Sequence, residues 1–240
     1  MTVLLVRDGR EFLCEPGDEL QTDLGVLEVP LDVEPGQSLE THLGEAFLVR
    51  RLRCPDLFHH LERTGAPMLP RDIGLLLGHT GIEAGDRVLD AGTGSGVLAA
   101  WMGRLDVEVV TYETNPEFAE VARENMRVAD VEDAVDVRTG DVTEALDTLG
   151  GFDGLTLDTE DAPAVVERAE DLLEADGVVG VYSPFVEDAR AVAEAARKAP
   201  LQGIETYETI QREMDFDDRG SRPTPTGVGH TGYLTVGRIK

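Results

Sequence analysis

The amino-acid sequence predicts an α/β protein: a doubly wound, seven-stranded sheet closed by a C-terminal antiparallel hairpin, with a small β-rich domain before it. Three observations predict this architecture. Short apolar runs separated by turn residues fill the first 55 residues, strands and helices alternate from there to about residue 199, and two more strands follow with no helix between them. We therefore expect one domain over residues 1–55 and a larger one over residues 56–240.

Strands are expected in the N-terminal segment because its apolar runs are short and end at turn-forming residues. The runs cover residues 3–6, 11–14, 24–29 and 47–49. Asp8-Gly9 and Pro16-Gly17-Asp18 break the first two, and no stretch carries a sustained helical repeat. This pattern indicates a small β-rich domain.

From residue 56 onward, helices and strands are expected to alternate. The predicted strands are residues 87–90, 107–112, 135–138, 154–157 and 178–182. The predicted helices lie around residues 75–77 and at 97–104, 116–129, 142–149, 162–175 and 186–199. Such alternation implies parallel strands joined by helical crossovers.

The last part of the chain departs from this alternation. Residues 204–210 and 233–236 have strand character, and an acidic, proline-containing loop over residues 215–225 separates them. Since no helix lies between the two strands, we expect an antiparallel hairpin that closes the sheet.

The chain is strongly acidic. Its 240 residues carry 48 acids and 21 basic residues, a formal charge of −27, and Lys198 and Lys240 are its only lysines. Because 41% of the residues are hydrophobic, the chain can bury a core, and the acids are expected on a folded surface. Such an excess of carboxylates suits a cytosol with molar salt, where the Debye length is about 3 Å. We therefore expect a halophilic protein.

Membrane-spanning and secreted proteins are disfavoured. No run of about 18 apolar residues occurs, and residues 1–10 lack the basic start and long apolar centre of a signal peptide. Cys14 and Cys54 are too few for a disulfide framework, so we expect reduced thiols in a cytoplasmic protein. No metal is expected, because Cys54 with His59 and His60 has no fourth ligand at a usual spacing.

A glycine-rich loop is the strongest functional motif. It follows an apolar strand and carries glycines at three alternate positions before a helix begins. Glycines there let the backbone approach a ligand beyond the carboxyl end of a strand. A nicotinamide dinucleotide is the competing ligand, but its fingerprint is GxGxxG and the spacing here is GxGxG. The candidate cofactor-binding residues of this motif are Asp90, Gly92, Thr93, Gly94, Ser95 and Gly96.

Two acids at the ends of the next strands complete the candidate cofactor site. Glu113 ends the second strand, where a carboxylate can accept both ribose hydroxyls. Asp141 follows the third strand and is placed to bind an adenine amino group at the same edge. A glycine loop for a methionine moiety, an acid for ribose and an acid for adenine together indicate S-adenosylmethionine.

Four segments carry a resemblance to a known family that is more specific than a shared cofactor. They are residues 41–49, 63–74 and 90–96, and the closing Val228-Gly229-His230-Thr231-Gly232-Tyr233-Leu234. In order and spacing they resemble the tRNA (adenine-N1)-methyltransferase family of archaea and bacteria. The resemblance implies a class I, Rossmann-like methyltransferase domain after a small β domain. It also implies a homotetramer that methylates N1 of T-loop adenines in tRNA, at positions 57 and 58.

The same resemblance makes Asp158 the candidate catalytic residue and a further cofactor contact. Asp158 stands at the carboxyl end of the fourth strand, where this family carries an acid. A carboxylate there can accept a hydrogen bond or a proton from the adenine exocyclic amine, which raises electron density at N1. The alternative is a strand-end acid that caps the next helix, a role for which Asp161 is better placed.

The chain departs from the family pattern near this acid. Ala162-Pro163 follows where the family often has Pro-Trp or a similar apolar pair, and Leu69 stands at a position that is usually aromatic. Tyr182 and His230 are therefore the candidates for stacking on the target base, whereas Trp101 is assigned to the core.

A short arginine-rich window is the candidate tRNA-binding face. Its five arginines fall within residues 50–71, where only Asp56 and Glu62 oppose them. Arginine binds phosphate bidentately and stacks on bases. The alternative is that these arginines pair with surface acids. They are Arg50, Arg51, Arg53, Arg63 and Arg71.

Two other functions stay open. A protein isoaspartyl methyltransferase has a similar Gly-Thr-Gly-Ser-Gly loop, and a noncatalytic RNA-binding subunit would keep the fold without a working pocket. Methyl transfer from S-adenosylmethionine to tRNA, to an isoaspartyl peptide or to neither separates the three functions.

Overall fold

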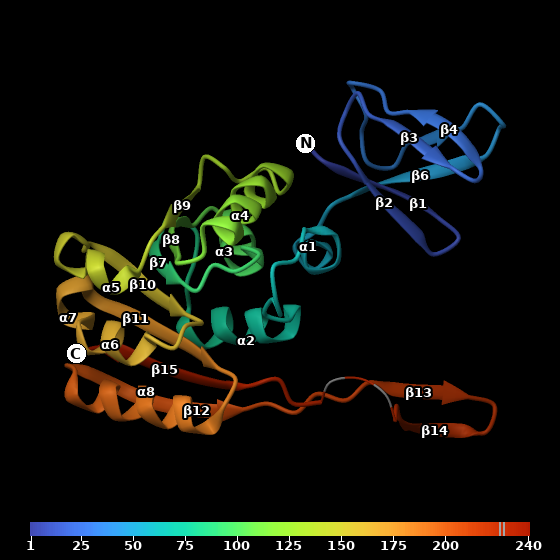
Figure 1. Ribbon diagram of the computed structural model, residues 1–240. Helices are drawn as coiled ribbons and strands as arrows, with labels where there is room; N and C mark the ends of the chain where they lie inside the picture. The colour runs from blue at the N-terminus through green and yellow to red at the C-terminus, as the bar shows by residue number, and fades with distance from the viewer. Residues whose placement is uncertain (226, 228) are drawn as a thin grey trace.

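The largest layer is a seven-stranded sheet with the order β12-β15-β11-β10-β7-β8-β9 (Figure 1). The computed structural model describes residues 1–225, 227 and 229–240, so Val228 of the C-terminal motif lies outside the described residues. The strands are β7 (Arg87–Ala91), β8 (Glu108–Glu113), β9 (Val135–Thr139), β10 (Phe152–Leu157), β11 (Leu173–Ser183), β12 (Leu201–Glu208) and β15 (Tyr233–Ile239). The first five run parallel, and β15 is antiparallel to both β11 and β12. The predicted doubly wound sheet with its closing antiparallel hairpin is confirmed.

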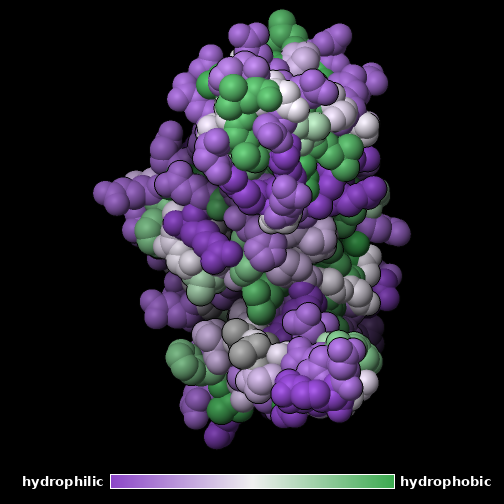
Figure 2. All heavy atoms as spheres, turned by 90° about the vertical axis from the view of Figure 1, so that its right-hand side faces the viewer, coloured by the Kyte–Doolittle hydropathy of each residue, from purple (hydrophilic) through white to green (hydrophobic). Residues whose placement is uncertain are grey.

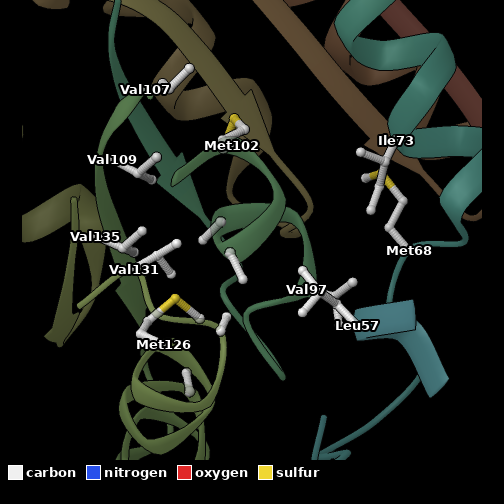
Figure 3. Packing of buried hydrophobic residues seen from close by; sticks show 14 of the residues in the cluster. Leu57, Met68, Ile73, Val97, Met102, Val107, Val109, Met126, Val131 and Val135 are labelled. Carbon is white, nitrogen blue, oxygen red and sulfur yellow. The ribbon is translucent and has the colours of Figure 1, made fainter. Parts of the chain in front are cut away.

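Helices cover both faces of this sheet because neighbouring residues of a strand point to opposite sides. Val88 and Val109 lie in one apolar cluster, and Leu89 and Val110 lie in the other. Figure 3 shows the first cluster, in which Met126 points from its helix toward the strands. The first face carries α2 (Pro70–Thr80), α3 (Val97–Gly103) and α4 (Pro116–Val128), and the second carries α5 (Val142–Ala145), α6 (Ala162–Glu167), α7 (Ala169–Leu172) and α8 (Val186–Lys198).

The N-terminal segment forms a separate sheet of order β2-β1-β6-β5 and an added β3-β4 hairpin. Its strands are β1 (Val3–Arg7), β2 (Arg10–Cys14), β3 (Glu19–Thr22), β4 (Gly25–Glu28), β5 (Ser38–Glu40) and β6 (Ala46–Arg51). Val3 and Leu5 face a core of their own, whereas Leu4 points the other way and packs with Leu52 and Leu57. The predicted β-rich character is confirmed, and β3 and β5 are additional strands that no apolar run marks.

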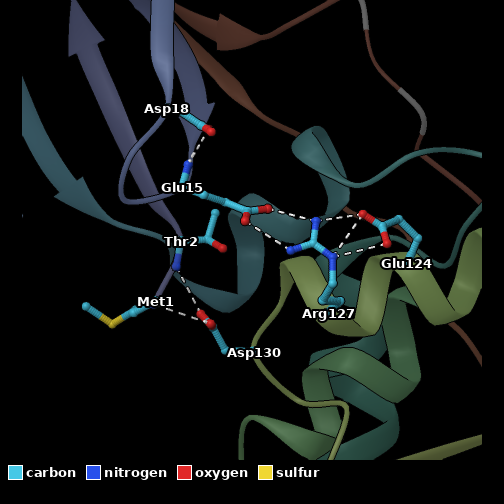
Figure 4. Close-up of polar contacts among 7 residues, drawn as sticks. All are labelled: Met1, Thr2, Glu15, Asp18, Glu124, Arg127 and Asp130. Carbon is cyan, nitrogen blue, oxygen red and sulfur yellow. Dashed lines mark hydrogen bonds and ion pairs between the residues drawn. The ribbon is translucent and has the colours of Figure 1, made fainter. Parts of the chain in front are cut away.

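Polar contacts from α4 also hold the N-terminal sheet (Figure 4). The Arg127 guanidinium lies 2.8 Å from Glu15 and 2.6 Å from Glu124. The backbone N–H of Thr2 donates to Asp130, just beyond the end of α4, at 3.1 Å. Exposed pairs of this kind contribute little individually, so the apolar contacts between the two layers carry most of the attachment.

The loop predicted over residues 215–225 is partly wrong. It begins as a two-stranded hairpin of β13 (Met214–Asp217) and β14 (Gly220–Pro223), which projects away from the large sheet (Figure 1). The side chains of this hairpin are almost all exposed, so no buried apolar run marks its strands. The alternation of strands and helices along the sequence therefore did not predict this hairpin.

The helix predicted over residues 162–175 is shorter than expected. Its turns are interrupted at Arg168 and end at Leu172, because Leu173 already pairs with Phe152 at the start of β11. Residues 142–149 likewise form only α5 and a short 3-10 helix over Leu146–Thr148.

Most of the acids lie on the outside of this fold; the buried ones among the described residues are Asp72, Asp90 and Glu113. Figure 2 shows one face of the molecule, on which hydrophilic residues cover most of the surface. The expectation that the charge of −27 belongs to a folded surface is met, because both faces of the large sheet are buried in apolar clusters.

Candidate active site

The glycine loop connects β7 to α3 with a backbone that only glycine adopts easily. Gly92 has φ 90° and Gly96 has φ 75°, both in the left-handed region. A Cβ on Gly92 would lie 2.0 Å from the carbonyl oxygen of Asp158, and one on Gly96 would lie 2.4 Å from Met126 Cε. Gly92 thus lets the loop pass directly beside the end of β10, and Gly96 lets it pack against α4.

Asp90 lies beneath this loop and is 3% exposed. Its carboxylate accepts hydrogen bonds from Thr111 Oγ1 at 2.5 Å and from Thr156 Oγ1 at 2.6 Å. Because the Thr111 hydroxyl is donated to Asp90, the Thr93 hydroxyl must be the donor in the 2.6 Å bond between Thr93 and Thr111. Burial raises the pKa of Asp90. The residue therefore ties the loop to two strands, and direct contact with a cofactor stays a prediction.

The two acids expected at the cofactor lie at the same edge of the sheet. Glu113 accepts the N–H of Gly94 at 2.9 Å, and its other carboxylate oxygen accepts the N–H of Asn115 at 2.9 Å. Asp141 caps α5 by accepting both the N–H and the hydroxyl of Thr143, and these bonds lower its pKa. Each Glu113 oxygen accepts one of these bonds and keeps a second lone pair, whereas both Thr143 bonds go to Oδ1 of Asp141 and leave its Oδ2 for a ligand. Ribose and adenine contacts by these acids stay predictions.

Asp158 follows β10 and faces the glycine loop. Its N–H donates to the carbonyl of Ala91 at 2.9 Å, which fixes the end of β10 against the end of β7. Within the described part of the chain its carboxylate accepts no hydrogen bond from the protein. Burial, and then the charge of Asp90, raise the pKa of Asp158 to about 7. An unbonded carboxylate with this pKa is a suitable acceptor for a substrate proton.

Replacing Asp158 with asparagine is expected to stabilise the protein at alkaline pH. The native state holds the Asp158 proton between about pH 4, where the unfolded chain releases it, and about pH 7, so stability is lost as pH rises through this window. The variant lacks this loss, and its melting temperature should exceed that of the wild type by at least about 2 °C near pH 8. Thermal unfolding near pH 4 is the control, since the advantage should shrink or vanish there.

A small pocket lies between the glycine loop and residues 64–68. Its volume is about 90 Å³, and Asp158, Phe118 and Leu98 also line it. The wall formed by residues 64–68 belongs to the irregular connection between α1 (Cys54–His60), a helix with no predicted counterpart, and α2. This pocket brings the predicted loop residues and Asp158 together in one site.

Tyr182 belongs to a polar network next to this pocket. Its hydroxyl bonds Thr231, and burial raises its pKa. Thr231 donates to Asp72 at 2.7 Å and accepts from Arg71 at 3.2 Å. Arg71 is 15% exposed at its side chain and points into this network rather than toward the other arginines of the window. Sequence analysis missed the 6% exposed Asp72, which only the fold brings beside residue 231.

The other arginines of the candidate tRNA face differ in whether they contact other residues of the protein. Arg50 pairs with Glu11 at 2.9 Å, and Arg63 lies over the ring of Phe58 at 4.5 Å. Arg51 and Arg53 are exposed and have no ion pair among the residues described; they line a groove on the N-terminal sheet. The window therefore contains both kinds of arginine: Arg50 and Arg71 are ion-paired, and Arg51 and Arg53 have no ion pair among the described residues.

Three further predicted roles are placed by the fold. His230 lies 3.1 Å from Glu208 and packs edge-on against Tyr233, so the contacts of the described residues do not join it to Asp158. Trp101 packs against the first apolar cluster, which confirms its place in the core. Asp161 occupies the N-cap position of α6 but makes no side-chain capping bond.

The described residues contain neither a metal-binding cluster nor a membrane-spanning helix. No group of three or more histidine, cysteine, aspartate or glutamate residues there could hold a metal ion. No helix in the same residues has the length and apolar composition needed to cross a bilayer. Both cysteines are free thiols, and burial raises the pKa of Cys14 to about 11.

The sheet order and the glycine loop at the end of β7 define a class I methyltransferase that depends on S-adenosylmethionine. The residues fit that cofactor, since Gly92 has no Cβ to keep the loop away from the end of β10 and an acid, Glu113, closes the end of β8. The chain belongs to the tRNA methyltransferase complex GCD14 subunit family, which it matches over residues 55–220. The predicted family is thereby confirmed.

Individual relatives cover nearly the whole chain. The tRNA (adenine(57)-N(1)/adenine(58)-N(1))-methyltransferase TrmI of Methanocaldococcus jannaschii is 32% identical over 99% of this chain and 94% of that protein. A SAM-dependent O-methyltransferase from Thermotoga maritima has a TM-score of 0.81 and 25% identity over 99% of this chain and 92% of that one. The tRNA (m1A58) methyltransferase TrmI of Aquifex aeolicus has a TM-score of 0.75 at 24% identity over 99% and 96% of the two chains, which shows a shared fold.

Proposed function

We propose that this protein methylates N1 of adenine in the T-loop of tRNA, at positions 57 and 58, with S-adenosylmethionine as methyl donor. The observation that carries the proposal is the partly buried carboxylate of Asp158 beside the glycine loop, which accepts no hydrogen bond from the described residues. Family membership and the relative named for positions 57 and 58 support the choice of substrate.

In this mechanism Asp158 acts on the target base. S-adenosylmethionine, when bound, supplies a methyl group on a sulfonium. The Asp158 carboxylate accepts a hydrogen bond or the proton of the adenine exocyclic amine, which makes N1 a better nucleophile. If the amine keeps its proton, the ionised carboxylate stabilises the positive charge that develops on the base during transfer; if the proton moves to Asp158, the methylated base is left neutral. A positive charge beside Asp158 favours its ionised form, so the pKa of about 7 should fall in the loaded site.

The base must leave its place in the tRNA before it can react. N1 lies on the pairing edge, so extraction costs a few kcal/mol and needs a pocket that holds the base. Tyr182 and His230 are our candidates for that pocket. Tyr182 is favoured, because the network of Thr231 and Asp72 fixes its hydroxyl in the neighbourhood of Asp158.

Arg51 and Arg53 are the proposed phosphate contacts on the N-terminal sheet. Replacing both with alanine is expected to raise KM for tRNA about 5- to 30-fold with little change in KM for S-adenosylmethionine, since each unpaired guanidinium can make charge-assisted hydrogen bonds. Arg190→Ala is the matched control, because Arg190 is exposed but paired with Glu194 on α8. Equal tRNA kinetics in both variants would remove these two arginines from the RNA face.

We further propose a homotetramer. The β13-β14 hairpin supports this, because it projects from the large sheet and leaves Phe216 78% exposed and Met214 44% exposed (Figure 1). Burial of such side chains against a second copy is favourable. Light scattering of the purified protein, with Phe216→Asp as the disrupting variant, measures the mass; a monomeric wild type would contradict the proposal.

The remaining proposals concern organisation and setting. We propose domains over residues 1–55 and 56–240, supported by the separate apolar core that holds Val3 and Phe47. We also propose a cytoplasmic, halophilic protein, supported by the charge of −27. Activity and thermal stability that increase toward molar potassium chloride would agree with that setting.

Labelled S-adenosylmethionine tests the proposed function. The protein is incubated with undermodified tRNA or with an isoaspartyl peptide, and the label recovered in each is counted. We expect label in tRNA alone. Label only in the peptide would support an isoaspartyl methyltransferase, and S-adenosylmethionine-independent tRNA binding without transfer would support a noncatalytic subunit.

A further inference from the structure

The connection between α1 and α2 forms one wall of the methionine side of the candidate cofactor site. Residues 62–69 have no helix or strand, yet residues 64–68 line the pocket opposite the glycine loop. An irregular segment at this place needs other contacts to hold one conformation. Two sets of hydrogen bonds supply them.

The first set comes from Asn125 in α4, which is 2% exposed. Its Oδ1 accepts the N–H of Glu62 at 3.0 Å. Its Nδ2 donates to the carbonyl of Glu62 at 2.9 Å and to the carbonyl of Ser95 at 2.8 Å. One buried amide therefore joins three separate pieces of chain: the segment, the glycine loop and α4.

The second set comes from Ser95 in the glycine loop. Its hydroxyl accepts the N–H of Thr64 at 2.9 Å and lies 3.3 Å from the Thr64 hydroxyl. Between these two anchors, Arg63 is held by stacking on Phe58 and by donating to the Phe58 carbonyl at 3.0 Å. The segment is thus fixed at residues 62, 63 and 64, immediately before it forms the pocket wall.

We propose that Asn125 is a positioning residue for the methyl donor. It holds residues 62–68 in one conformation, and these residues form a fixed wall for the methionine end of S-adenosylmethionine. The inference rests on the proposed function only in requiring that cofactor. Only an amide both accepts from the Glu62 N–H and donates to two carbonyls at this position. A wall that is ordered beforehand spares the binding step the entropy of ordering it.

Two variants separate this role from simple burial. Asn125→Asp keeps the size and the acceptor but loses both donated bonds, and Asn125→Ala loses all three. We expect the dissociation constant for S-adenosylhomocysteine, measured by calorimetry without tRNA, to rise at least about tenfold in both. Tryptic cleavage after Arg63 should become faster. At saturating S-adenosylmethionine, kcat should stay within about threefold of the wild type, so the effect falls on KM.

Val192→Ala is the matched control for lost stability. Val192 is 1% exposed on α8, in the apolar cluster on the opposite face of the sheet, and has no contact with the segment. This variant should lose stability but keep the ligand affinity and the slow cleavage after Arg63. If the Asn125 variants bind the ligand as tightly as the wild type or more tightly, residues 62–68 are not a positioned wall and the inference is wrong. If the wild type binds the ligand but does not methylate tRNA, the proposed function fails and the inference stands.

Discussion

Asp158→Ala is expected to lower kcat/KM for tRNA methylation by about 100-fold or more. Asp158 is the carboxylate of the site that no protein donor occupies in the described structure, and it lies beside the loop that we propose holds the methyl donor. Without it the exocyclic amine of the target adenine keeps its proton, and the cation formed at N1 has no counter-charge. Initial rates at several tRNA concentrations, with S-adenosylmethionine saturating, measure the loss.

Two controls make this result specific to the carboxylate. Asp161→Ala changes an acid three residues further on, at the start of α6, and should keep nearly full activity. Calorimetry with S-adenosylhomocysteine establishes that the Asp158 variant still binds. If it binds and retains more than about a tenth of the wild-type activity, Asp158 is not the residue that performs the chemistry.

Gly92→Ala is expected to damage both the fold and the cofactor site. The new methyl group would lie 2.0 Å from the carbonyl oxygen of Asp158, and the backbone at φ 90° is strained for any other residue. Relief of this clash must separate the glycine loop from the end of β10. We expect a loss of about 2 to 4 kcal/mol in the free energy of unfolding. Because Asp158 moves as well, kcat/KM for S-adenosylmethionine should fall about 100-fold.

Gly85→Ala distinguishes the clash from backbone strain. Gly85 has φ 95°, close to that of Gly92, but a Cβ there would meet nothing within 4 Å. This control should cost about 1 kcal/mol and leave the kinetics unchanged. Equal effects of the two substitutions, by urea unfolding and initial rates, would show that the approach of the loop to β10 is unimportant.

The large sheet and its cofactor edge could be predicted because local sequence carries both. Strands and helices alternate with clear apolar patterns, and the three glycines of residues 92–96 occur together with Asp90 in one short segment. Glu113 could be predicted because the carboxyl ends of parallel strands meet at one edge. Asp158 is predicted from the family resemblance, and the pairing of β10 with β7 places it at that edge. Each of these residues is specified by its own strand.

The rest of the site depends on contacts between distant segments, which no local pattern shows. Asn125 looks like an ordinary polar residue of an amphipathic helix, yet it is buried because residue 62 crosses over it. The sequence predicts that Arg71 is available for RNA, but its contacts with Asp72 and Thr231 hold it inside the protein. Thr231 lies 160 positions further along the chain, so no local pattern shows this contact. Charge counted along the chain could not distinguish Arg71 from Arg51.

The acidity of the chain is compatible with the proposed RNA substrate, because the described acids do not pair with every arginine of the candidate tRNA face. The surplus acids cover the surface, while the described structure leaves Arg51 and Arg53 unpaired on the N-terminal sheet. In molar salt, counterion release contributes little to binding, so shape and hydrogen bonds must select the tRNA. We therefore expect the effect of these two arginines to persist at high salt.

Nucleoside analysis of the product tests the central claim most directly. Undermodified tRNA is incubated with the protein and S-adenosylmethionine, digested to nucleosides and separated by chromatography with mass detection, with the Asp158→Ala protein as the parallel reaction. We predict 1-methyladenosine from the wild type and at most about a hundredth as much from the variant. Methylation of another nucleoside or of another adenine atom, or equal 1-methyladenosine from both proteins, would contradict a site in which Asp158 activates N1.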